Sequence, residues 1–255
     1  MAYPPAQGQE FRKILGINFF VGDAKRAVDL VYKGGLLVVP AAPSLKNLPE
    51  DHEYREALLN SDLAITDSAL MVLVWNFMQR DNISRLSGLE YLVELLSRPE
   101  VRQSAGTFWI MASEQSMKNN LGWLAARGVM VSPEDVYIAP LYRSTIDDPA
   151  LLQKIQTRRP ANIIVAIGGG TQERLGLYLK RNLDWLPAIH CIGAAIAFLS
   201  GDQVRIPLWA DYIYLGWLFR CLSNPMRFIP RYWSARKLVS LMLRYKAGLP
   251  IADAT

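Results

Sequence analysis

Asp67 stands where the chemistry of a parallel sheet is usually found. The stretch LAITDSALMVLVW, residues 63–75, predicts a short apolar strand that ends at Asp67 and Ser68 and continues as an apolar helix. Open α/β sheets bind their ligands beyond the carboxyl ends of the strands, and a carboxylate held there can act as a general base. Asp and Ser are also preferred capping residues at helix starts. The local pattern therefore leaves two interpretations, a catalytic base and a helix cap.

A glycine turn in IIVAIGGGTQERLG, residues 163–176, is the second candidate site. An apolar strand runs into three glycines, and three polar residues then open a helix: Gly168, Gly169, Gly170, Thr171, Gln172 and Glu173. Glycines let a ligand approach the backbone, and a helix N-terminus favours phosphate. The dinucleotide fingerprint GxGxxG would need glycine where Glu173 stands, which argues against a nicotinamide-type site. A nucleotide diphosphate site and a plain strand-to-helix turn both remain open.

Arg85 is the third candidate. It precedes Ser87 and Gly88 in ISRLSGLEYL, residues 83–92, at a predicted loop-to-helix junction. An arginine in such a position can hold a phosphate with two parallel hydrogen bonds. The alternative is a solvated loop charge, which is the more common case.

Residues that bind metal ions or form nucleophilic triads are few and scattered. The two histidines, His52 and His190, are far apart in sequence, which argues against a histidine-built zinc site or a histidine-based triad. The acidic cluster DHE, residues 51–53, lies in a helix-like polar stretch and not at a strand end. The DD pair at 147–148 precedes a proline and predicts a helix start. We therefore expect neither a metal ion nor a cofactor.

The C-terminal segment 212–250 is strongly basic. It contains no Asp or Glu, whereas the whole chain carries a net charge of only +5, so the remainder is slightly acidic. Aromatic and apolar residues interleave with its basic ones at helical spacing, a pattern typical of a helix on a membrane surface. Nucleic acid would suit aromatic and basic residues as well, but no RRM, KH or helix-turn-helix signature is present. A third interpretation is that the segment packs on the preceding domain. The basic residues are Arg220, Arg227, Arg231, Arg236, Lys237, Arg244 and Lys246.

The elements that would position these residues alternate along the chain. Strand-like runs such as RKILGINFF (12–20) and ANIIVAIGGG (161–170) are each followed by a helix-like run. This alternation predicts βαβ units and a mostly parallel sheet, and apolar runs such as IIVAI fit strands covered on both faces. We predict a Rossmann-like α/β domain over residues 1–210, with helices flanking its sheet, and a basic helical appendage over residues 211–255.

Composition agrees with a protein that works inside the cell. Hydrophobic residues make up 51% of the 255-residue chain, enough for a sizeable core. Cys191 and Cys221 stand in apolar surroundings without a CxxC pattern, so we expect reduced thiols. The N-terminus lacks the apolar region of a signal peptide. No run reaches the roughly 18–20 apolar residues of a membrane-spanning helix. We expect a cytoplasmic protein whose basic C-terminal segment suits peripheral contact with a membrane surface.

Four segments, in order along the chain, resemble one enzyme family. They are SDLAITDSALMV (61–72), RLSGLEYL (85–92), GGGTQERL (168–175) and RIPLWADYIYLGWLFRCLSNPMRFIPRYW (205–233), of which the last is the most specific. The family is that of the WecG/TagA/CpsF glycosyltransferases, glycosyltransferase family 26. The resemblance extends over nearly the whole chain.

This resemblance implies an inverting, metal-independent enzyme. Such an enzyme moves a sugar from a UDP-sugar to an undecaprenyl-diphosphate-linked sugar at the cytoplasmic leaflet of the bacterial inner membrane. Its products feed exopolysaccharide, capsule or teichoic acid synthesis. The resemblance assigns the catalytic base to Asp67 and the motif arginine to Arg85. It places the donor-binding Gln-Glu pair, and the appendage arginines that dock on the membrane and close the site, at Gln172, Glu173, Arg220, Arg227 and Arg231.

The chain departs from the family pattern at three places, which leaves its sugars open. Ser68 replaces a glycine, Gly170 and Thr171 replace Pro-Lys, and a polar segment with Thr and Asn appears as apolar or small residues at 39–42. We expect transfer of glucose or an N-acetylhexosamine-type sugar. The GumM-like branch of the family, which builds exopolysaccharide, is one subgroup to which the chain could belong. The residues alone also allow a Rossmann-type nucleotide-binding oxidoreductase or a non-catalytic membrane-surface protein. The sequence does not predict an oligomeric state.

Overall fold

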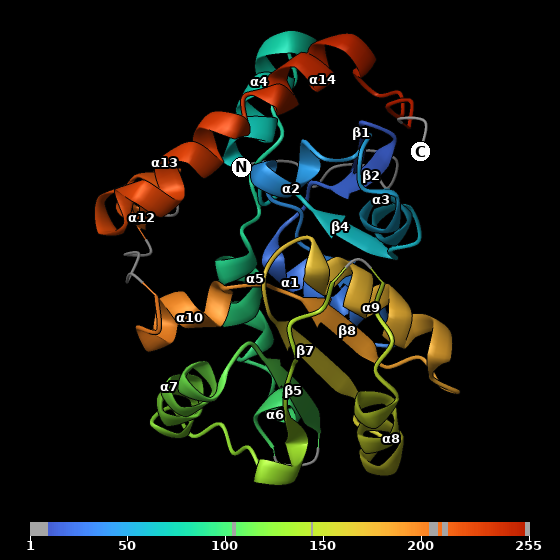
Figure 1. Cartoon of the computed structure of the whole chain (residues 1–255), viewed down its shortest axis with the longest axis vertical. Helices are drawn as coiled ribbons and strands as arrows, with labels where there is room; N and C mark the ends of the chain where they lie inside the picture. Colours follow the sequence, from blue (N-terminus) through green and yellow to red (C-terminus); the bar gives the residue numbers. More distant parts are fainter. Residues whose placement is uncertain (1–9, 104–105, 144, 204–208, 211–213, 253–255) are drawn as a thin grey trace.

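One mixed sheet forms the centre of the molecule (Figure 1). The computed structural model describes residues 10–103, 106–143, 145–203, 209–210 and 214–252, without the side chain of Arg227. The strand order is β1-β2-β4-β3-β8-β7-β5-β6, in which β1 is antiparallel to β2 and the other pairs are parallel. This confirms the predicted α/β fold. The strands are β1 (Phe11–Ile14), β2 (Ile17–Phe20), β3 (Gly35–Val38), β4 (Leu63–Ile65), β5 (Thr107–Met111), β6 (Val136–Ile138), β7 (Asn162–Ala166) and β8 (Ala188–Cys191).

The first strand-like run is a hairpin and not one strand. RKILGINFF contains β1 and β2, with a turn at Leu15 and Gly16 between them. Gly16 has φ of +81°, a conformation that glycine adopts at little cost and that lets the chain reverse. The apolar periodicity of the run is the same for one strand or two, so only the glycine indicated the break.

Helices cover both faces of the sheet. Alternate side chains of β3 and of the residue after it divide between two hydrophobic clusters: Leu36 and Val38 join one, and Leu37 and Val39 the other. Strands buried on both faces account for the continuous apolar runs. Helices of the first cluster are α2 (Ala42–Leu45), α3 (His52–Leu59), α4 (Ala69–Gln79), α8 (Pro149–Arg158), α9 (Thr171–Asn182) and α14 (Lys237–Tyr245). Helices of the second are α1 (Ala24–Val31), α5 (Gly88–Leu95), α6 (Pro99–Arg102), α7 (Glu114–Ala125) and α10 (Ala195–Ser200).

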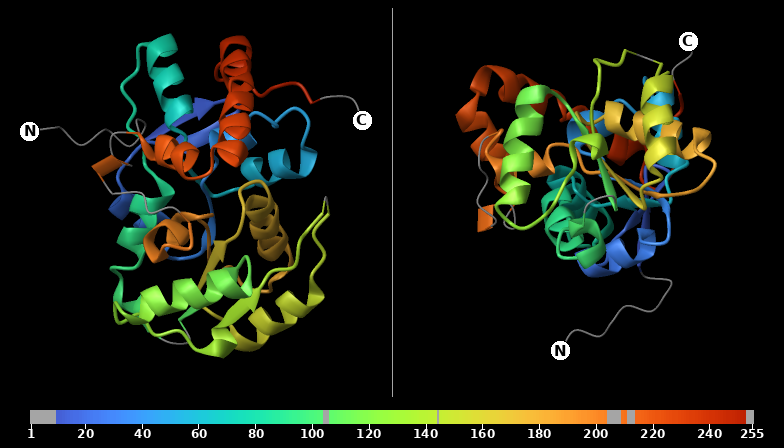
Figure 2. Two further views of the ribbon diagram at one scale, coloured as in Figure 1. Left: turned by 60° about the vertical axis from the view of Figure 1, so that its left-hand side comes forward. Right: turned by 90° about the horizontal axis from the view of Figure 1, so that it is seen from below.

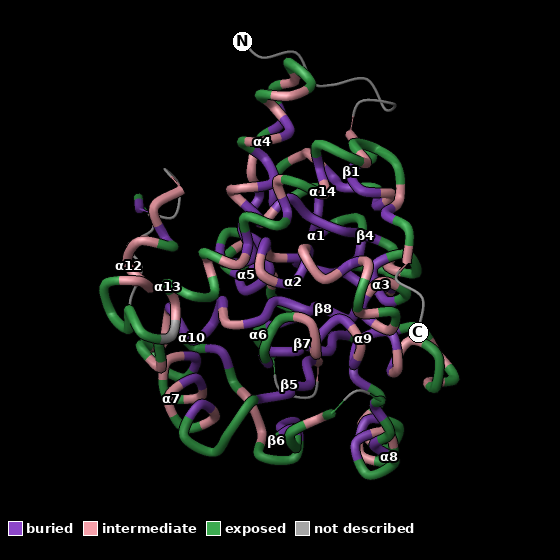
Figure 3. The backbone as a smooth tube through the Cα atoms, turned by 45° about the horizontal axis from the view of Figure 1, so that its top comes forward, coloured by how far each residue is buried: buried purple, intermediate pink, exposed green. Residues whose placement is uncertain are grey.

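The carboxyl ends of four central strands meet at one edge of the sheet. The strands β4, β3, β8 and β7 are neighbours and run parallel, so the segments that follow them emerge side by side. Figure 3 shows β4, β7 and β8 buried, with exposed residues mainly on the surrounding turns and helices. Asp67 follows β4 and the glycine turn follows β7. The topology therefore brings the first two candidate sites of the sequence to the same place.

Two C-terminal helices lie beyond this edge. They are α12 (Gly216–Ser223) and α13 (Pro225–Ser234), which pack against each other (Figures 1 and 2). In addition, α12 contacts α10 through Arg220 and Phe198, and α13 contacts α2. Phe198 of α10 belongs to a small cluster with Ala210, against which Leu215 and Phe219 pack. The predicted basic helical appendage is therefore present. None of the helices in the described ranges is long and apolar enough to cross a bilayer.

The last helix, α14, packs differently from α12 and α13. Its Leu238 and Met242 are fully buried in the main core, and the helix lies beside α4 (Figure 2). After α14 the chain returns to the β1–β2 turn. There, the amide N–H of Leu15 donates to the carbonyl of Lys246 at 2.8 Å. The C-terminal helix is thus part of the core packing, as the third interpretation of the basic segment required.

Candidate active site

Asp67 is not the cap of the helix that follows it. Ser68 caps α4, because its Oγ accepts the amide N–H of Met71 at 3.2 Å. The Asp67 carboxylate turns instead to the start of α5, where Oδ1 accepts the amide N–H of Gly88 at 3.0 Å. A helix N-terminus favours negative charge. Ser68 therefore caps the helix, and the Asp67 carboxylate faces the strand ends.

Arg85 contacts Asp67 directly. Its Nε donates to the Asp67 carbonyl at 2.6 Å, and its Nη2 lies 3.3 Å from the carboxylate Oδ1. The guanidinium also lies over the ring of Tyr214, 5.8 Å from the ring centre. The loop is tied to the end of β4 because Thr66 Oγ1 donates to the Ser84 carbonyl at 2.9 Å. With its side chain only 12% exposed, Arg85 is not a solvated loop charge.

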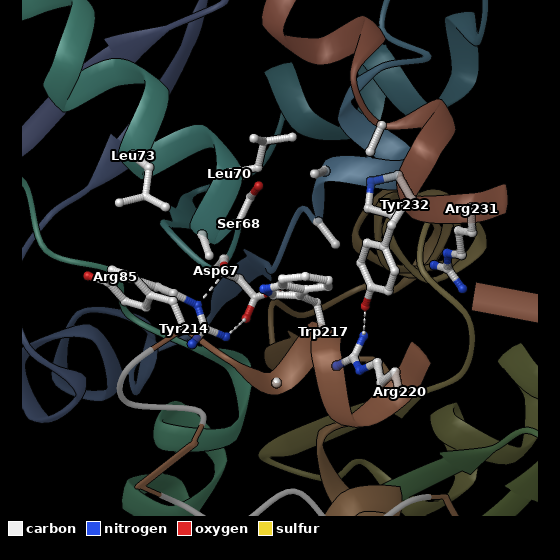
Figure 4. A pocket seen from close by; sticks show the side chains of 16 residues that line it. Asp67, Ser68, Leu70, Leu73, Arg85, Tyr214, Trp217, Arg220, Arg231 and Tyr232 are labelled. Atoms are coloured by element: carbon white, nitrogen blue, oxygen red, sulfur yellow. Dashed lines mark hydrogen bonds and ion pairs between the residues drawn. The ribbon is translucent and has the colours of Figure 1, made fainter. Parts of the chain in front are cut away.

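Two cavities meet at Asp67 (Figure 4). The larger, about 360 Å³, is mainly apolar and lies between α4 and the helices α12 and α13. The smaller, about 150 Å³, lies over the strand ends and is bounded by the turns after β7 and β8. A reactant in each cavity would contact the other beside this carboxylate. The residues that line both cavities are Ala41, Asp67, Arg85, Arg220 and Arg231.

Of the three polar residues that follow the glycine turn, one, Gln172, lines the smaller cavity. Gly168, Gly169 and Gln172 line that cavity, while Gly170 and Glu173 do not. Glu173 is fully buried and bonds within the turn, where its Oε2 accepts the amide N–H of Gly170 at 2.7 Å and its Oε1 accepts Nε2 of Gln172 at 3.0 Å. Burial raises the pKa of Glu173 to about 7. Oε1 of Gln172 is buried without a hydrogen-bond partner among the described residues.

The arginines of the appendage reach the same place. Arg220 lies over the ring of Phe198, 4.3 Å from its centre, and its Nη1 donates to the Tyr232 hydroxyl at 3.3 Å. Arg231 also lines both cavities, whereas the side chain of Arg227 lies outside the described residues. Figure 4 shows Arg220 and Tyr232 on the opposite side of Trp217 from Arg85. The fold thus collects residues from five separate parts of the chain around one carboxylate.

Comparison with known proteins identifies the family. The model of the glycosyl transferase WecG/TagA/CpsF family matches residues 12–250. The chain belongs to this family. The resemblance seen in the four sequence segments is therefore confirmed, and the glycosyltransferase assignment prevails over the oxidoreductase and the non-catalytic alternatives.

Two curated relatives in the WecG/TagA/CpsF family come from Bacillus. Both are named N-acetylglucosaminyldiphosphoundecaprenol N-acetyl-beta-D-mannosaminyltransferase. The protein of Bacillus spizizenii W23 is 22% identical over 221 residues, which cover 83% of this chain and 80% of the relative. The protein of Bacillus subtilis 168 is 23% identical over 189 residues, which cover 72% and 71%.

Several aromatic residues of this WecG/TagA/CpsF chain were not predicted to line the site. Tyr214, Trp217 and Tyr232 line the larger cavity and Phe198 the smaller one. The sequence shows the first three interleaved with arginines, a pattern that indicates a membrane surface, nucleic acid or packing on the domain but does not by itself assign these rings to a cavity. The turn after β8, which contains Gly193, was also missed. An apolar strand that ends in a glycine beside small residues was the signal that could have found it.

The two histidines stay outside the site. Nε2 of His190 donates to Asn162 Oδ1 at 3.2 Å, and Nδ1 accepts from the Tyr91 hydroxyl at 2.8 Å. Burial lowers the pKa of His190 to about 3, so the ring is neutral near pH 7. Asp148 caps α8, as the sequence predicted for the DD pair. Across the described ranges, no group of three or more His, Cys, Asp and Glu is arranged to hold a metal ion.

Proposed function

We propose that this protein transfers a sugar from a UDP-sugar to a sugar linked to a polyprenyl diphosphate, with Asp67 as the general base. The observation that carries the proposal is the position of Asp67, where the mainly apolar cavity meets the cavity over the strand ends. Both Bacillus relatives are named for transfer to N-acetylglucosaminyldiphosphoundecaprenol. An acceptor of this kind has a sugar, a diphosphate and an isoprenoid chain, and a site with one carboxylate, several arginines and an apolar wall matches that order.

The smaller cavity is the proposed donor site. Gly168 and Gly169 leave the backbone accessible there, and α9 begins at the same turn. Its N-terminus would favour the diphosphate of a UDP-sugar. Arg220 and Arg231 add positive charge at the boundary with the other cavity. Gln172 offers an unpartnered acceptor to a donor hydroxyl or N–H group, while Glu173 holds the turn in shape.

The proposed reaction is a single displacement. Asp67 takes the proton of an acceptor hydroxyl while that oxygen attacks the anomeric carbon, and the bond to UDP breaks with its electron pair leaving on the UDP oxygen. Attack from the face opposite UDP inverts the configuration. General base catalysis contributes about 10²- to 10⁴-fold. Arg85 orients the base, and the α9 N-terminus stabilises the charge that develops on UDP without a metal ion. Arg220 and Arg231 bind the diphosphate of UDP equally in the ground state and in the transition state.

The C-terminal helices are the proposed contact with the cytoplasmic leaflet of the inner membrane. Their charged residues are all basic, and each Lys or Arg close to an anionic leaflet contributes about 1 kcal/mol. Several large apolar side chains of α12 and α13 are exposed as well: Trp217, Leu222, Met226, Ile229 and Trp233. In this proposal residues 1–210 form the α/β glycosyltransferase domain, and residues 211–255 form the appendage that contacts the membrane. Because α14 fills the core, the docking role is better tested with point variants than with a truncation at residue 211.

A donor panel tests the proposed function. The full chain is assayed with UDP-glucose, UDP-N-acetylglucosamine and UDP-N-acetylmannosamine against synthetic N-acetylglucosaminyl-diphosphate-prenol, and both UDP and the glycosylated lipid are measured. We expect one UDP-sugar to give product with inverted configuration, with and without EDTA. UDP should raise the melting temperature, whereas NAD should not. Absence of product with all donors and acceptors, or loss of activity in EDTA, would contradict the corresponding part of the proposal.

A further inference from the structure

We propose that a groove between α4 and α12 carries the isoprenoid chain of the acceptor from Asp67 to the membrane surface. Leu70, Leu73 and Phe77 of α4 form one wall, and Trp217 of α12 forms the other. This inference rests on the proposed function and adds to it. It assigns to a helix of the α/β domain, outside the basic appendage, the role of binding lipid.

The composition of α4 is unusual for a helix with an exposed side. Its eleven residues, Ala69–Gln79, include no charged side chain. Leu73 is 54% exposed and Phe77 is 88% exposed. A surface helix normally places charged or polar residues on its outer face, and contiguous exposed apolar residues mark interaction sites. Burial in the core does not explain this side of α4.

A stripe of apolar side chains starts beside the Asp67 carboxylate: Leu70 is partly buried against the core, and Leu73 and Phe77 are exposed. Leu70, Leu73 and Phe77 are spaced i, i+3 and i+7, so they lie along one side of the helix. Leu70 and Leu73 line the 360 Å³ cavity, and Phe77 lies further along the same side. Asp67 immediately precedes the helix. Figure 4 shows Leu70 and Leu73 above Asp67 on α4, so the stripe leads away from the base.

The opposite side of α4 is fixed in the core. Met71, Val72 and Trp75 are buried in the main hydrophobic cluster, and Leu238 and Met242 of α14 are buried in the same cluster. The helix is therefore held on one side and presents its other side to the cavity and solvent. A wall of this kind keeps its position whether or not a ligand is bound.

The side chains along the larger cavity indicate which part of the acceptor lies against which wall. Asp67 lies at one end, Arg220 and Arg231 line the boundary with the donor cavity, and the remaining walls include Trp217, which is 47% exposed. A sugar hydroxyl at the carboxylate would place the acceptor diphosphate near these arginines. The first isoprenoid units would then lie between Leu73 and Trp217. The basic charge at one end and the apolar stripe at the other complement a lipid diphosphate.

A chain-length series tests this groove apart from membrane docking. Two acceptors carry the same sugar diphosphate on isoprenoid chains of two and of four units, both in solution without vesicles. The measured quantity is the ratio of kcat/KM for the longer acceptor to that for the shorter. We expect the wild type to prefer the longer chain and Phe77→Ser to lower the ratio by about 5- to 10-fold, since loss of a few apolar contacts costs that much discrimination. Leu73→Ser should lower kcat/KM for both acceptors, because Leu73 faces the first isoprenoid units, which both carry.

Two control variants make the outcome specific. Leu141→Ser changes an almost fully exposed leucine after β6, and Leu222→Ser changes an exposed leucine of α12 that does not line the cavity. Both should keep the wild-type ratio, although Leu222→Ser should weaken binding to anionic vesicles. Equal ratios in all variants would overturn the groove while leaving the proposed function intact. Wild-type transfer to neither acceptor would overturn the proposed function and the groove together. Melting temperatures near that of the wild type establish that the variants fold.

Discussion

The site has two walls that are built in different ways. On the sheet side, Asp67 and Gln172 are held by hydrogen bonds of about 3.0 Å to groups on the sheet-edge loops, and Arg85 binds the backbone of Asp67 at 2.6 Å. On the helical side, Arg220 rests on an aromatic ring and one hydrogen bond of 3.3 Å to Tyr232. The first wall is mostly buried, whereas the second belongs to helices with exposed apolar side chains.

We expect this difference to separate the chemical step from substrate retention. Groups that act in the transition state need fixed positions, which buried strand ends and short loops provide. A wall that admits a bulky lipid must be able to open, and helices joined by loops open at lower cost. We therefore expect changes on the sheet side to lower kcat and changes on the helical side mainly to raise KM.

Asp67→Asn should have the largest effect. An amide cannot take the acceptor proton, so we expect kcat to fall about 10²- to 10⁴-fold with little change in the KM for the UDP-sugar. The Asn oxygen can still accept the Gly88 amide, so the melting temperature should change little. Steady-state kinetics and thermal unfolding check both points. Asp184→Asn, at an exposed ion pair with Arg159, is the matched control and should behave as wild type. Near-wild-type turnover of Asp67→Asn would show that Asp67 is not the general base.

Arg220→Ala should come next and should act mainly through binding. It removes a cation from both cavities and the packing on Phe198. We expect kcat/KM to fall about 10- to 100-fold, with the larger part in KM. Tyr232→Phe keeps the arginine and removes only the 3.3 Å hydrogen bond, so its loss should be less than about fivefold. A fall in kcat alone for Arg220→Ala would instead assign the helical wall to the chemical step.

Glu173→Gln should change the pH dependence of stability. Burial raises the pKa of Glu173 from 4.5 to about 7, so the folded protein holds this proton more tightly than the unfolded chain. The stability it contributes is present below about pH 4.5 and is lost as the pH rises through about 7, by up to about 3 kcal/mol. His190 acts in the opposite direction, because its lowered pKa costs stability as the pH falls below 6.5.

Denaturant unfolding of wild type and Glu173→Gln between pH 4.5 and 8 isolates this contribution. His190 is the same in both proteins and cancels in the difference. We expect the free energy of unfolding of the variant, minus that of the wild type, to increase as the pH rises. Parallel curves would show that Glu173 does not titrate in this range and that the sheet-side turn is held in another way.

Ser68 variants should have the smallest effect. Loss of the capping hydroxyl in Ser68→Ala should lower the free energy of unfolding by about 1 kcal/mol, and Ser68→Gly by a few tenths, because glycine is itself an acceptable capping residue. The donor preference of Ser68→Gly is the informative measurement. An unchanged preference leaves Ser68 as a cap only, whereas a shift toward another UDP-sugar would give this residue a part in specificity.

The sequence alone determined the order of elements and the positions of the polar residues at strand ends. Alternating apolar runs encode buried parallel strands locally, so the α/β fold, the helix over residues 69–79 and the placement of Asp67 and the glycine turn followed from them. The family could also be recognised, because its segments are short and retain their order. Hydrophobic periodicity and strand termini depend on neighbouring residues, which is why these features could be predicted.

Only the tertiary structure decided what each polar group does. Asp67 meets Gly88 and Arg85 across about twenty residues of chain, and Arg220 meets Phe198 in the same long-range way. The same packing directs the Glu173 side chain toward the glycine turn, where its carboxylate is buried and accepts the Gly170 amide N–H. Local patterns cannot choose among such partners, because each partner is brought close only when the strand ends converge and the C-terminal helices fold back over them. The sequence could not tell whether Asp67 caps α4, but the structure shows that Ser68 is the cap and that the Asp67 carboxylate faces both cavities.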